Sequence, residues 1–184
     1  MTMSSNKIIV QNMVCPRCSE SVEGILNKLK INFDSVSIGE IKLSKKINPN
    51  LLIELEQNLN EKGFSILKDE KLIIVEKVKN LIHVKVANMT FSSEKFSVEI
   101  SKKLNYNYSY VSRVFSANTG FTIEKYLLKC KIDKVKELIR YQKFSIKEIA
   151  YLLDYNSLSH LSNHFKRETG ITPSQFKKKH KFIK

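Results

Sequence analysis

The chain has 184 residues, 42% of them hydrophobic, and a formal net charge of +14, which suits one domain or two small ones with packed cores. No stretch reaches the roughly 18 apolar residues of a membrane span, and the N-terminal apolar run, Ile8–Val10, is too short for a signal peptide. Three cysteines do not make a disulfide framework. We therefore expect a cytoplasmic protein with reduced thiols and no membrane partner.

The positive charge is concentrated in one part of the chain. Residues 1–69 carry a net charge of +1, whereas residues 70–184 carry +13. A localised positive excess favours a polyanionic partner, because neutralising phosphates releases their condensed counterions. The alternative is a lysine-rich solvated surface, but the nearly neutral first part of the chain argues against it.

Residues 7–68 have the pattern of a small α+β domain. The order strand-helix-strand-strand-helix-strand is that of ferredoxin-like domains, although the middle hairpin is weak and can be a single strand. The predicted elements are a strand at Lys7–Met13, a helix at about Pro16–Lys30, an extended segment at Val36–Leu43, a helix at Leu51–Asn60 and a strand at Phe64–Leu67.

A Cys-x-x-Cys motif falls where the first strand gives way to the first helix. With Met13 before Cys15 and Cys18, and Gly63-Phe64 further on, this segment resembles the heavy-metal-associated domain. The resemblance implies a soft ion such as Cu(I) held by both thiolates. A helix N-terminus also lowers thiol pKa values, so thiol redox sensing is a second hypothesis, and cysteines kept without either chemistry are a third.

Residues 70–88 are predicted to form a helix that joins the two parts of the chain. Its apolar residues exceed one stripe, so it has surface to pack on the C-terminal domain or on a partner subunit. They are Leu72, Ile73, Val75, Val78, Leu81, Ile82 and Val86.

Residues 93–180 carry one helical pattern twice. Phe96–Asn107 lies 49 positions before Ser145–Asn156, and Ser109–Thr122 lies 50 positions before Ser159–Thr172. The change of offset falls in a turn between two helices. Each copy reads as a helix-turn-helix, and two such units in a basic chain indicate a DNA-binding protein. The identical pairs include Glu99/Glu148, Ile100/Ile149, Tyr106/Tyr155, Ser112/Ser162, Phe115/Phe165 and Gly120/Gly170.

Local signals set the helix ends in both copies. The first copy predicts helices from Ser93 and over Tyr108–Thr119, the latter stopped by Gly120. In the second copy Ser145 and Glu148 have the spacing of a capping box. The remaining predicted helices are Ser157–Thr169, ended by Gly170, and a short one opened by Thr172 and Pro173.

Between the copies, Ile123–Tyr141 reads as one continuous helix, with Cys130 expected to be a buried, inert thiol. Such a helix is a rod of roughly 27 Å. It can present two recognition helices to successive major grooves, which lie about 34 Å apart.

The second copy resembles the second half of the AraC/XylS-type DNA-binding domain, and the resemblance extends over the C-terminal half of the chain. Two positions depart from the family pattern: Asp154 stands where glycine is common, and Asn163 where arginine is frequent. The matching positions are Ile149-Ala150, Asp154-Tyr155, Phe165-Lys166, Gly170, Thr172-Pro173-Ser174 and Phe176.

The outward side of each second helix is expected to contact DNA. Arg113 is the strongest candidate for base reading, because a guanidinium pairs bidentately with guanine; a phosphate contact is the alternative. For Asn163, adenine pairing and phosphate contact stay open. Lys177–Lys179 and Lys181 form a terminal basic run. The candidate set is Tyr108, Ser109, Tyr110, Ser112, Arg113, Ser159, His160, Ser162, Asn163 and Lys166.

The expected fold class is an α+β, ferredoxin-like domain (residues 1–69), a connecting helix (70–88) and an all-α double helix-turn-helix domain (89–184). We expect a transcriptional regulator, not an enzyme, that binds double-stranded DNA. RNA polymerase and a homodimer partner are further expectations, and the first domain would sense or dimerise. The alternatives are a soft-metal binding or trafficking module with a DNA-binding tail, and a thiol oxidoreductase using Cys15 and Cys18.

Overall fold

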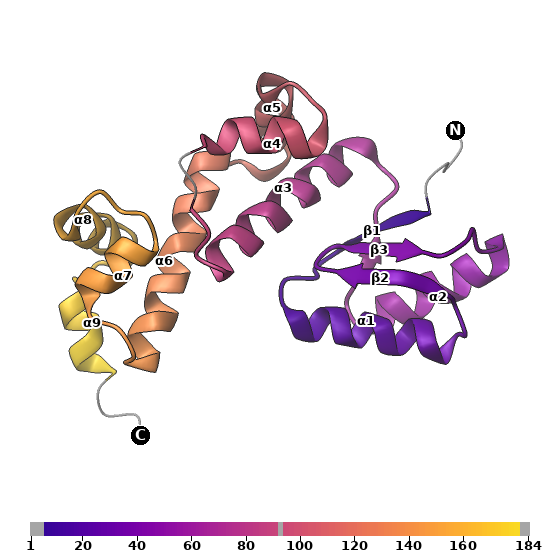
Figure 1. Cartoon of the computed structure of the whole chain (residues 1–184), viewed down its shortest axis with the longest axis horizontal. Coiled ribbons are helices and arrows are strands. Elements are labelled where there is room, and N and C mark those ends of the chain that lie inside the picture. The colour runs from indigo at the N-terminus through magenta and orange to yellow at the C-terminus, as the bar shows by residue number, and fades with distance from the viewer. Residues whose placement is uncertain (1–5, 92–93, 181–184) are drawn as a thin grey trace. The chain divides into compact units, whose positions relative to one another are not determined.

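The computed structural model describes residues 6–91 and 94–180 (Figure 1). Two compact units are present, and the boundary between them falls within one helix, between Asn80 and Leu81; Arg113–Asn118 group with the first unit. Each unit buries its own cluster of apolar side chains. The predicted helix start at Ser93 and the predicted basic residue Lys181 lie outside the described residues.

The first unit contains a four-stranded sheet in the order β2-β3-β1-β4, and each neighbouring pair is antiparallel. The predicted succession of strands and helices is confirmed, and the middle segment is a two-stranded hairpin rather than a single strand. The elements are β1 (Lys7–Gln11), α1 (Pro16–Lys28), β2 (Phe33–Ser37), β3 (Glu40–Leu43), α2 (Pro49–Glu61) and β4 (Ser65–Ile66).

The core of the first unit lies between the sheet and helices α1 and α2, which cover one face of it (Figure 1). Successive side chains of a strand point to opposite faces, so Ile8 and Val10 of β1 enter this core together. Burying one side chain of this size stabilises the folded state by about 1.5–3 kcal/mol. The helices add Val22, Ile25 and Leu26 from α1, and Leu55 and Leu59 from α2.

Helix α3 (Glu70–Ala87) begins in the first unit. Its Asn80 side chain lies against Gly39 in the β2–β3 turn, where an added Cβ would fall 1.7 Å from the Asn80 amide nitrogen. Gly39 also has a φ of +79°, so this position favours glycine twice over. Glu76 is buried, and burial raises the pKa of its carboxyl group although Lys79 lies 3.8 Å away. Packing, rather than sequence periodicity, therefore decides which side of α3 faces this unit.

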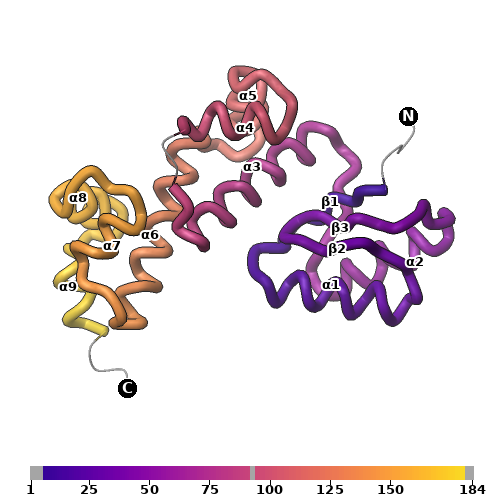
Figure 2. Tube along the Cα trace, viewed as in Figure 1, coloured from indigo at the N-terminus to yellow at the C-terminus, as the bar shows by residue number. Residues whose placement is uncertain are grey.

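The second unit consists of helices. The second half of α3 belongs to it, and α6 contacts α7, α8 and α9 (Figure 2). The continuous helix predicted between the two copies, Ile123–Tyr141, and both helix-turn-helix units are confirmed. The remaining elements, of which residues 113–118 of α5 group with the first unit, are α4 (Phe96–Leu104), α5 (Tyr108–Thr119), α6 (Ile123–Tyr141), α7 (Ile146–Leu152), α8 (Leu158–Thr169) and α9 (Pro173–Lys179).

The turns and caps form as their residue types predict. The turn residues Asn105 and Asp154 have φ values of 56° and 54°, a left-handed conformation that asparagine and aspartate tolerate better than other non-glycine residues. Ser145 and Glu148 form the predicted capping box at the start of α7. Thr172 caps α9 through the backbone N–H of Gln175. These local bonds fix where α7 and α9 begin.

The second helix-turn-helix unit is built on a continuous core. It joins the inner side of α6 to α7 and α8, with Phe176 of α9 packed against it. Phe165 is fully buried, and its ring meets that of Phe176 edge to face, with centroids 5.4 Å apart. The buried members are Ile132, Val135, Leu138, Ile139, Ile149, Ala150, Leu153, Tyr155, Leu161 and Phe165.

The two copies of the repeat differ in how they use one glutamate. Glu148 caps α7, whereas its equivalent Glu99 forms ion pairs with Lys85 at 2.6 Å and Lys103 at 3.0 Å. Lys85 lies in the second half of α3 and is 7% exposed, so this pair is shielded from solvent. Glu99 thus ties α4 to α3, a role that residue identity across the repeat does not reveal.

Candidate nucleic-acid interface

Helix α8 presents a polar surface opposite its buried side. Leu161, His164 and Phe165 face inward, and the Ser157 hydroxyl caps the helix by accepting the His160 backbone N–H at 3.0 Å. The structure brings the predicted residues of this helix together on its outer side, where Ser162 is half-buried and the others are exposed. The exposed ones are Ser159, His160, Asn163 and Lys166.

Helix α5 has the same arrangement, with Val111, Val114 and Phe115 buried. Of the predicted contact residues, Ser109 and Arg113 are exposed, while Tyr108, Tyr110 and Ser112 are half-buried. Arg113 and Asn163 occupy the same repeat position, and both are exposed. The two helices therefore offer a guanidinium and a carboxamide at equivalent places, two groups that read guanine and adenine edges, respectively.

Tyr108 has a second role besides any contact with DNA. Its hydroxyl donates a hydrogen bond to the Glu124 carboxylate in the first turn of α6. Burial, and then this carboxylate, raise the pKa of Tyr108 well above its usual range. The hydroxyl therefore stays protonated and fastens the start of α5 to the start of α6. Tyr110 likewise packs against Tyr106, with ring centroids 5.6 Å apart.

His164 forms a buried polar link beneath the α8 surface. It is 4% exposed, and its Nδ1 atom lies 2.9 Å from the Tyr155 hydroxyl. Burial, followed by the nearby Arg167 guanidinium, lowers the pKa of the His164 imidazole. His164 is therefore neutral in the folded protein at neutral pH, and the link holds α8 to the residue that follows the α7 turn.

Acidification is expected to destabilise this unit through His164. Below the unfolded-state pKa of about 6.5, the imidazole binds a proton in the unfolded chain but stays neutral in the folded protein. The free energy of unfolding therefore falls as the pH drops from about 6.5 towards the folded-state pKa. Urea unfolding at pH 7.5 and at pH 5.5 measures the effect. A His164→Gln variant should be less stable at pH 7.5 but should lose less on acidification. If the wild type and the His164→Gln variant lose the same free energy of unfolding on acidification, other groups cause the acid sensitivity.

The two N-terminal thiols lie close together at the start of α1. Cys15 is the N-cap residue, and its sulfur is 3.3 Å from that of Cys18. Burial opposes ionisation of Cys18, but hydrogen bonding with the Val14 backbone and the Cys15 thiol outweighs it, and the Cys18 pKa is lowered. Among the described residues, no group of three or more His, Cys, Asp or Glu side chains is placed to hold a metal ion.

Cys130 contrasts with this pair. It is half-buried in α6, and burial, together with Asp133, raises the pKa of its thiol to about 11. A thiol protonated at neutral pH is a poor nucleophile and a poor metal ligand. The structure thus agrees with the expectation of an inert cysteine.

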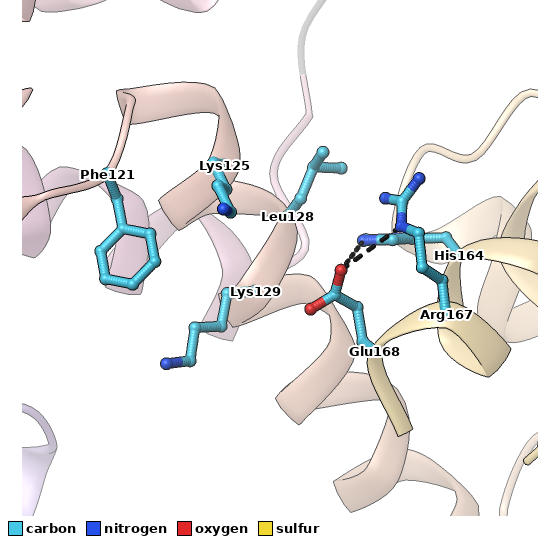
Figure 3. Close-up of a pocket in the computed structure, with 7 residues that line it drawn as sticks. All are labelled: Phe121, Lys125, Leu128, Lys129, His164, Arg167 and Glu168. Carbon is cyan, nitrogen blue, oxygen red and sulfur yellow. Dashed lines mark hydrogen bonds and ion pairs between the residues drawn. The ribbon is translucent and has the colours of Figure 1, made fainter. Parts of the chain in front are cut away.

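Sequence reasoning missed a group of basic residues between α6 and α8. Lys125 and Lys129 of α6 line the same cleft as Arg167 of α8, with the Lys129 side chain pointing away from Arg167 (Figure 3). The spacing of four between the two lysines puts them on one side of a helix, and this signal was available in the sequence. That α8 forms the other wall was not, because only tertiary packing brings residues 125 and 167 together.

Comparison with known proteins identifies the C-terminal part of the chain. A family described as a helix-turn-helix domain matches residues 100–179. The Msm operon regulatory protein of Streptococcus mutans is 31% identical over 104 residues, 56% of this chain and 36% of that protein. An uncharacterized HTH-type transcriptional regulator of Pseudoalteromonas carrageenovora is 26% identical over 157 residues, 80% of this chain and 88% of that protein.

A solved structure has the same fold. The C-terminal domain of AraT, a response regulator from Geobacillus stearothermophilus, superposes with a TM-score of 0.50 at 24% identity, covering 58% of this chain and 84% of that one. Residues 100–179 are therefore an AraC-type helix-turn-helix DNA-binding domain, and the resemblance expected from the sequence is confirmed. Both relatives with this domain are named as regulatory proteins.

The family match is confined to this domain, whereas the alignment with the Pseudoalteromonas relative extends over 80% of the chain. The chain spans about a third of the length of the streptococcal relative. Within the described part of the chain, no helix is both long and apolar enough to cross a membrane.

Proposed function

We propose that the protein is a sequence-specific transcriptional regulator that reads two successive major grooves with α5 and α8. The observation that carries this proposal is the repeated helix-turn-helix pair on the 19-residue helix α6. At 1.5 Å per residue α6 is roughly 28 Å long, comparable with the distance of about 34 Å between successive major grooves. One chain can then read a bipartite site without a two-fold partner.

The base-contacting residues follow from the surfaces of the two recognition helices. We assign Arg113 to one half-site and Asn163 to the other, because each is exposed at the same repeat position. The residues that flank Arg113 on the α5 surface are Ser109, Tyr110 and Ser112. Tyr108 contributes mainly by fixing α5 through Glu124. The second set, at the α8 surface, is Ser159, His160, Ser162 and Lys166.

The proposal also assigns a role to each part of the chain. Residues 1–69 form a ferredoxin-like sensing or dimerisation domain, 70–88 a connecting helix, and 89–184 the DNA-binding domain. The succession of elements and the strand order β2-β3-β1-β4 support the ferredoxin-like assignment. The partners of the whole protein would be double-stranded DNA in the cytoplasm, RNA polymerase at the promoter, and a second copy of the chain.

Selection from genomic DNA tests the central claim. Purified protein is incubated with genomic fragments at physiological salt, and the retained fragments are sequenced. The expected result is a shared bipartite motif whose halves lie about one helical turn apart. Retention without a shared motif would mean that positive charge alone binds DNA, and the regulator proposal would have to be abandoned.

A second candidate activity is binding of a soft monovalent ion such as Cu(I) by Cys15 and Cys18. The 3.3 Å separation of the two sulfurs and the lowered pKa of Cys18 favour it, because soft ions prefer thiolates. Met13 is fully buried and so unsuited to be a third ligand. Two thiolates are ligands that a soft two-coordinate ion prefers, which is the basis for sensing or for metal trafficking.

Replacing both Cys15 and Cys18 by serine is expected to abolish stoichiometric Cu(I) binding, measured by competition with a chromophoric Cu(I) chelator under anaerobic conditions. Cys130→Ser is the matched control and should bind as the wild type does, because its thiol is protonated. Equal Cu(I) uptake by the double variant and the wild type would remove the metal assignment. A metal-dependent change in DNA affinity that is lost in the double variant would favour sensing over trafficking.

A further inference from the structure

A cleft of about 610 Å³ lies in the second unit between α6 and α8, and we call it the central cleft (Figure 3). The α6 wall carries Lys125 and Lys129, and the α8 wall carries Arg167. Both lysine ammonium groups lie over the Phe121 ring, 5.4 Å and 5.5 Å from its centroid. The full lining is Phe121, Lys125, Leu128, Lys129, His164, Arg167 and Glu168.

The central cleft has an excess of positive charge. Glu168 is the one carboxylate among the described residues that line it; the Glu168 Oε1 atom lies 3.5 Å from Arg167 Nε and 4.0 Å from His164 Nε2. His164 is neutral because burial lowers its pKa. Within the described part of the chain, Lys125 and Lys129 have no ion-pair partner, whereas Lys134 and Lys136 of the same helix are each paired. Two exposed cations without a counter-charge, backed by an apolar ring, suit an anion.

The central cleft also borders the surface assigned to base reading. Arg167 lies four residues after Asn163 on α8, so the two side chains share one ridge of the helix. His160 and His164 form the adjacent ridge. On the other wall, Lys125 lies one residue after Glu124, to which the start of α5 is fastened. The cleft therefore lies along the helix that joins the two recognition helices.

We propose that the central cleft binds the DNA phosphate backbone between the two major grooves, with Lys125, Lys129 and Arg167 as its phosphate contacts. This inference rests on the proposed function, because it requires both recognition helices to engage one duplex. Between two successive major grooves a duplex presents its minor groove and the flanking phosphates to the protein. Contacts there fix register and spacing, and they carry no base information.

The salt dependence of binding provides the first test. The probe is a duplex bearing the selected bipartite motif, compared with a scrambled duplex of the same length. Lys125→Gln combined with Lys129→Gln should weaken binding to both duplexes by the same factor. Because each phosphate contact contributes about 0.9 to the slope of log affinity against log salt, two lost contacts make the fall between 50 and 200 mM salt about tenfold smaller.

Matched variants separate a local contact from a general loss of charge. Lys45→Gln with Lys46→Gln removes the same charge from exposed lysines of the first unit and should leave the affinity unchanged. Lys125→Arg with Lys129→Arg should restore wild-type binding, since phosphate contact needs charge rather than a particular cation. Glu168→Gln should strengthen binding by removing a repulsive carboxylate. Equal losses in the two Gln double variants would overturn the proposal.

Neutral phosphates locate the contact on the DNA. Methylphosphonates placed only between the two half-sites should weaken wild-type binding more than binding by the Lys125→Gln, Lys129→Gln variant, which keeps only the Arg167 contact. The same loss in both proteins would show that the central cleft does not touch these phosphates. If the wild type selects no shared motif at all, the proposed function itself fails; if it selects one and the variants bind normally, only the central cleft assignment fails.

Discussion

Replacing Phe165 by alanine is expected to destabilise the second unit by about 3–5 kcal/mol, the cost of truncating a buried phenylalanine. The Phe165 ring is fully buried where α6, α7 and α8 meet, and it contacts Phe176 edge to face. The loss combines the removed apolar area with a cavity that three capped helices cannot close. Urea unfolding of the full chain, followed by hydrogen exchange of peptides from α7 to α9, measures it.

Tyr151→Ala is the matched control, because Tyr151 is also an aromatic residue of this unit but is 85% exposed. Its replacement should change the free energy of unfolding by less than about 0.5 kcal/mol. A loss below about 1 kcal/mol for Phe165→Ala would mean that the second helix-turn-helix unit does not depend on this core. DNA binding should follow stability in the Phe165 variant and stay normal in the Tyr151 variant.

Arg113→Ala is expected to weaken binding to the selected duplex by about 1–3 kcal/mol, the usual cost of losing one bidentate base contact. The side chain is exposed on α5, between the buried positions Val111 and Val114. Equilibrium titrations should use the intact motif and two duplexes in which one half-site or the other is scrambled. The loss should disappear when the half-site read by Arg113 is already scrambled.

Asn163→Ala provides the internal control, because Asn163 holds the same repeat position on α8. The loss of affinity caused by Asn163→Ala should disappear when the other half-site is scrambled. If the Arg113 variant instead weakens binding to all three duplexes equally, Arg113 is a phosphate contact, and the recognition of that half-site belongs to other residues of α5. If both variants respond to the same half-site, α5 and α8 do not read separate grooves.

The double helix-turn-helix could be read from the sequence because local chemistry specifies its parts. The bounds Tyr108–Thr119 and Ile123–Tyr141 agree with the helices observed, and Gly120 adopts the left-handed conformation expected after α5. Capping boxes, left-handed turn residues and buried stripes at helical spacing all act within a few residues of each other. The family resemblance added that these parts form a DNA-binding domain.

The fold of the N-terminal half was harder to predict from the sequence, for a physical reason. Strands of four or five residues give a weak periodic signal, so the sequence left open whether the middle segment is a hairpin or a single strand. The register of β2 and β3, which pairs Val36 with Ile41, shows a hairpin. Gly39 marked the turn, but its close approach to Asn80 of α3 links residues far apart in the chain. Such contacts depend on how elements pack, which no local pattern encodes.

By itself, the sequence determined the helices with their caps and turns and the exposed positions Arg113 and Asn163, because hydrophobic spacing and capping chemistry are local. Only the tertiary structure decided what those side chains meet. It fastened Tyr108 to Glu124, buried His164 against Tyr155, and brought Arg167 opposite the two lysines of α6. Each of these depends on residues brought together by the packing of separate helices, and that packing follows from the whole core rather than from any one segment.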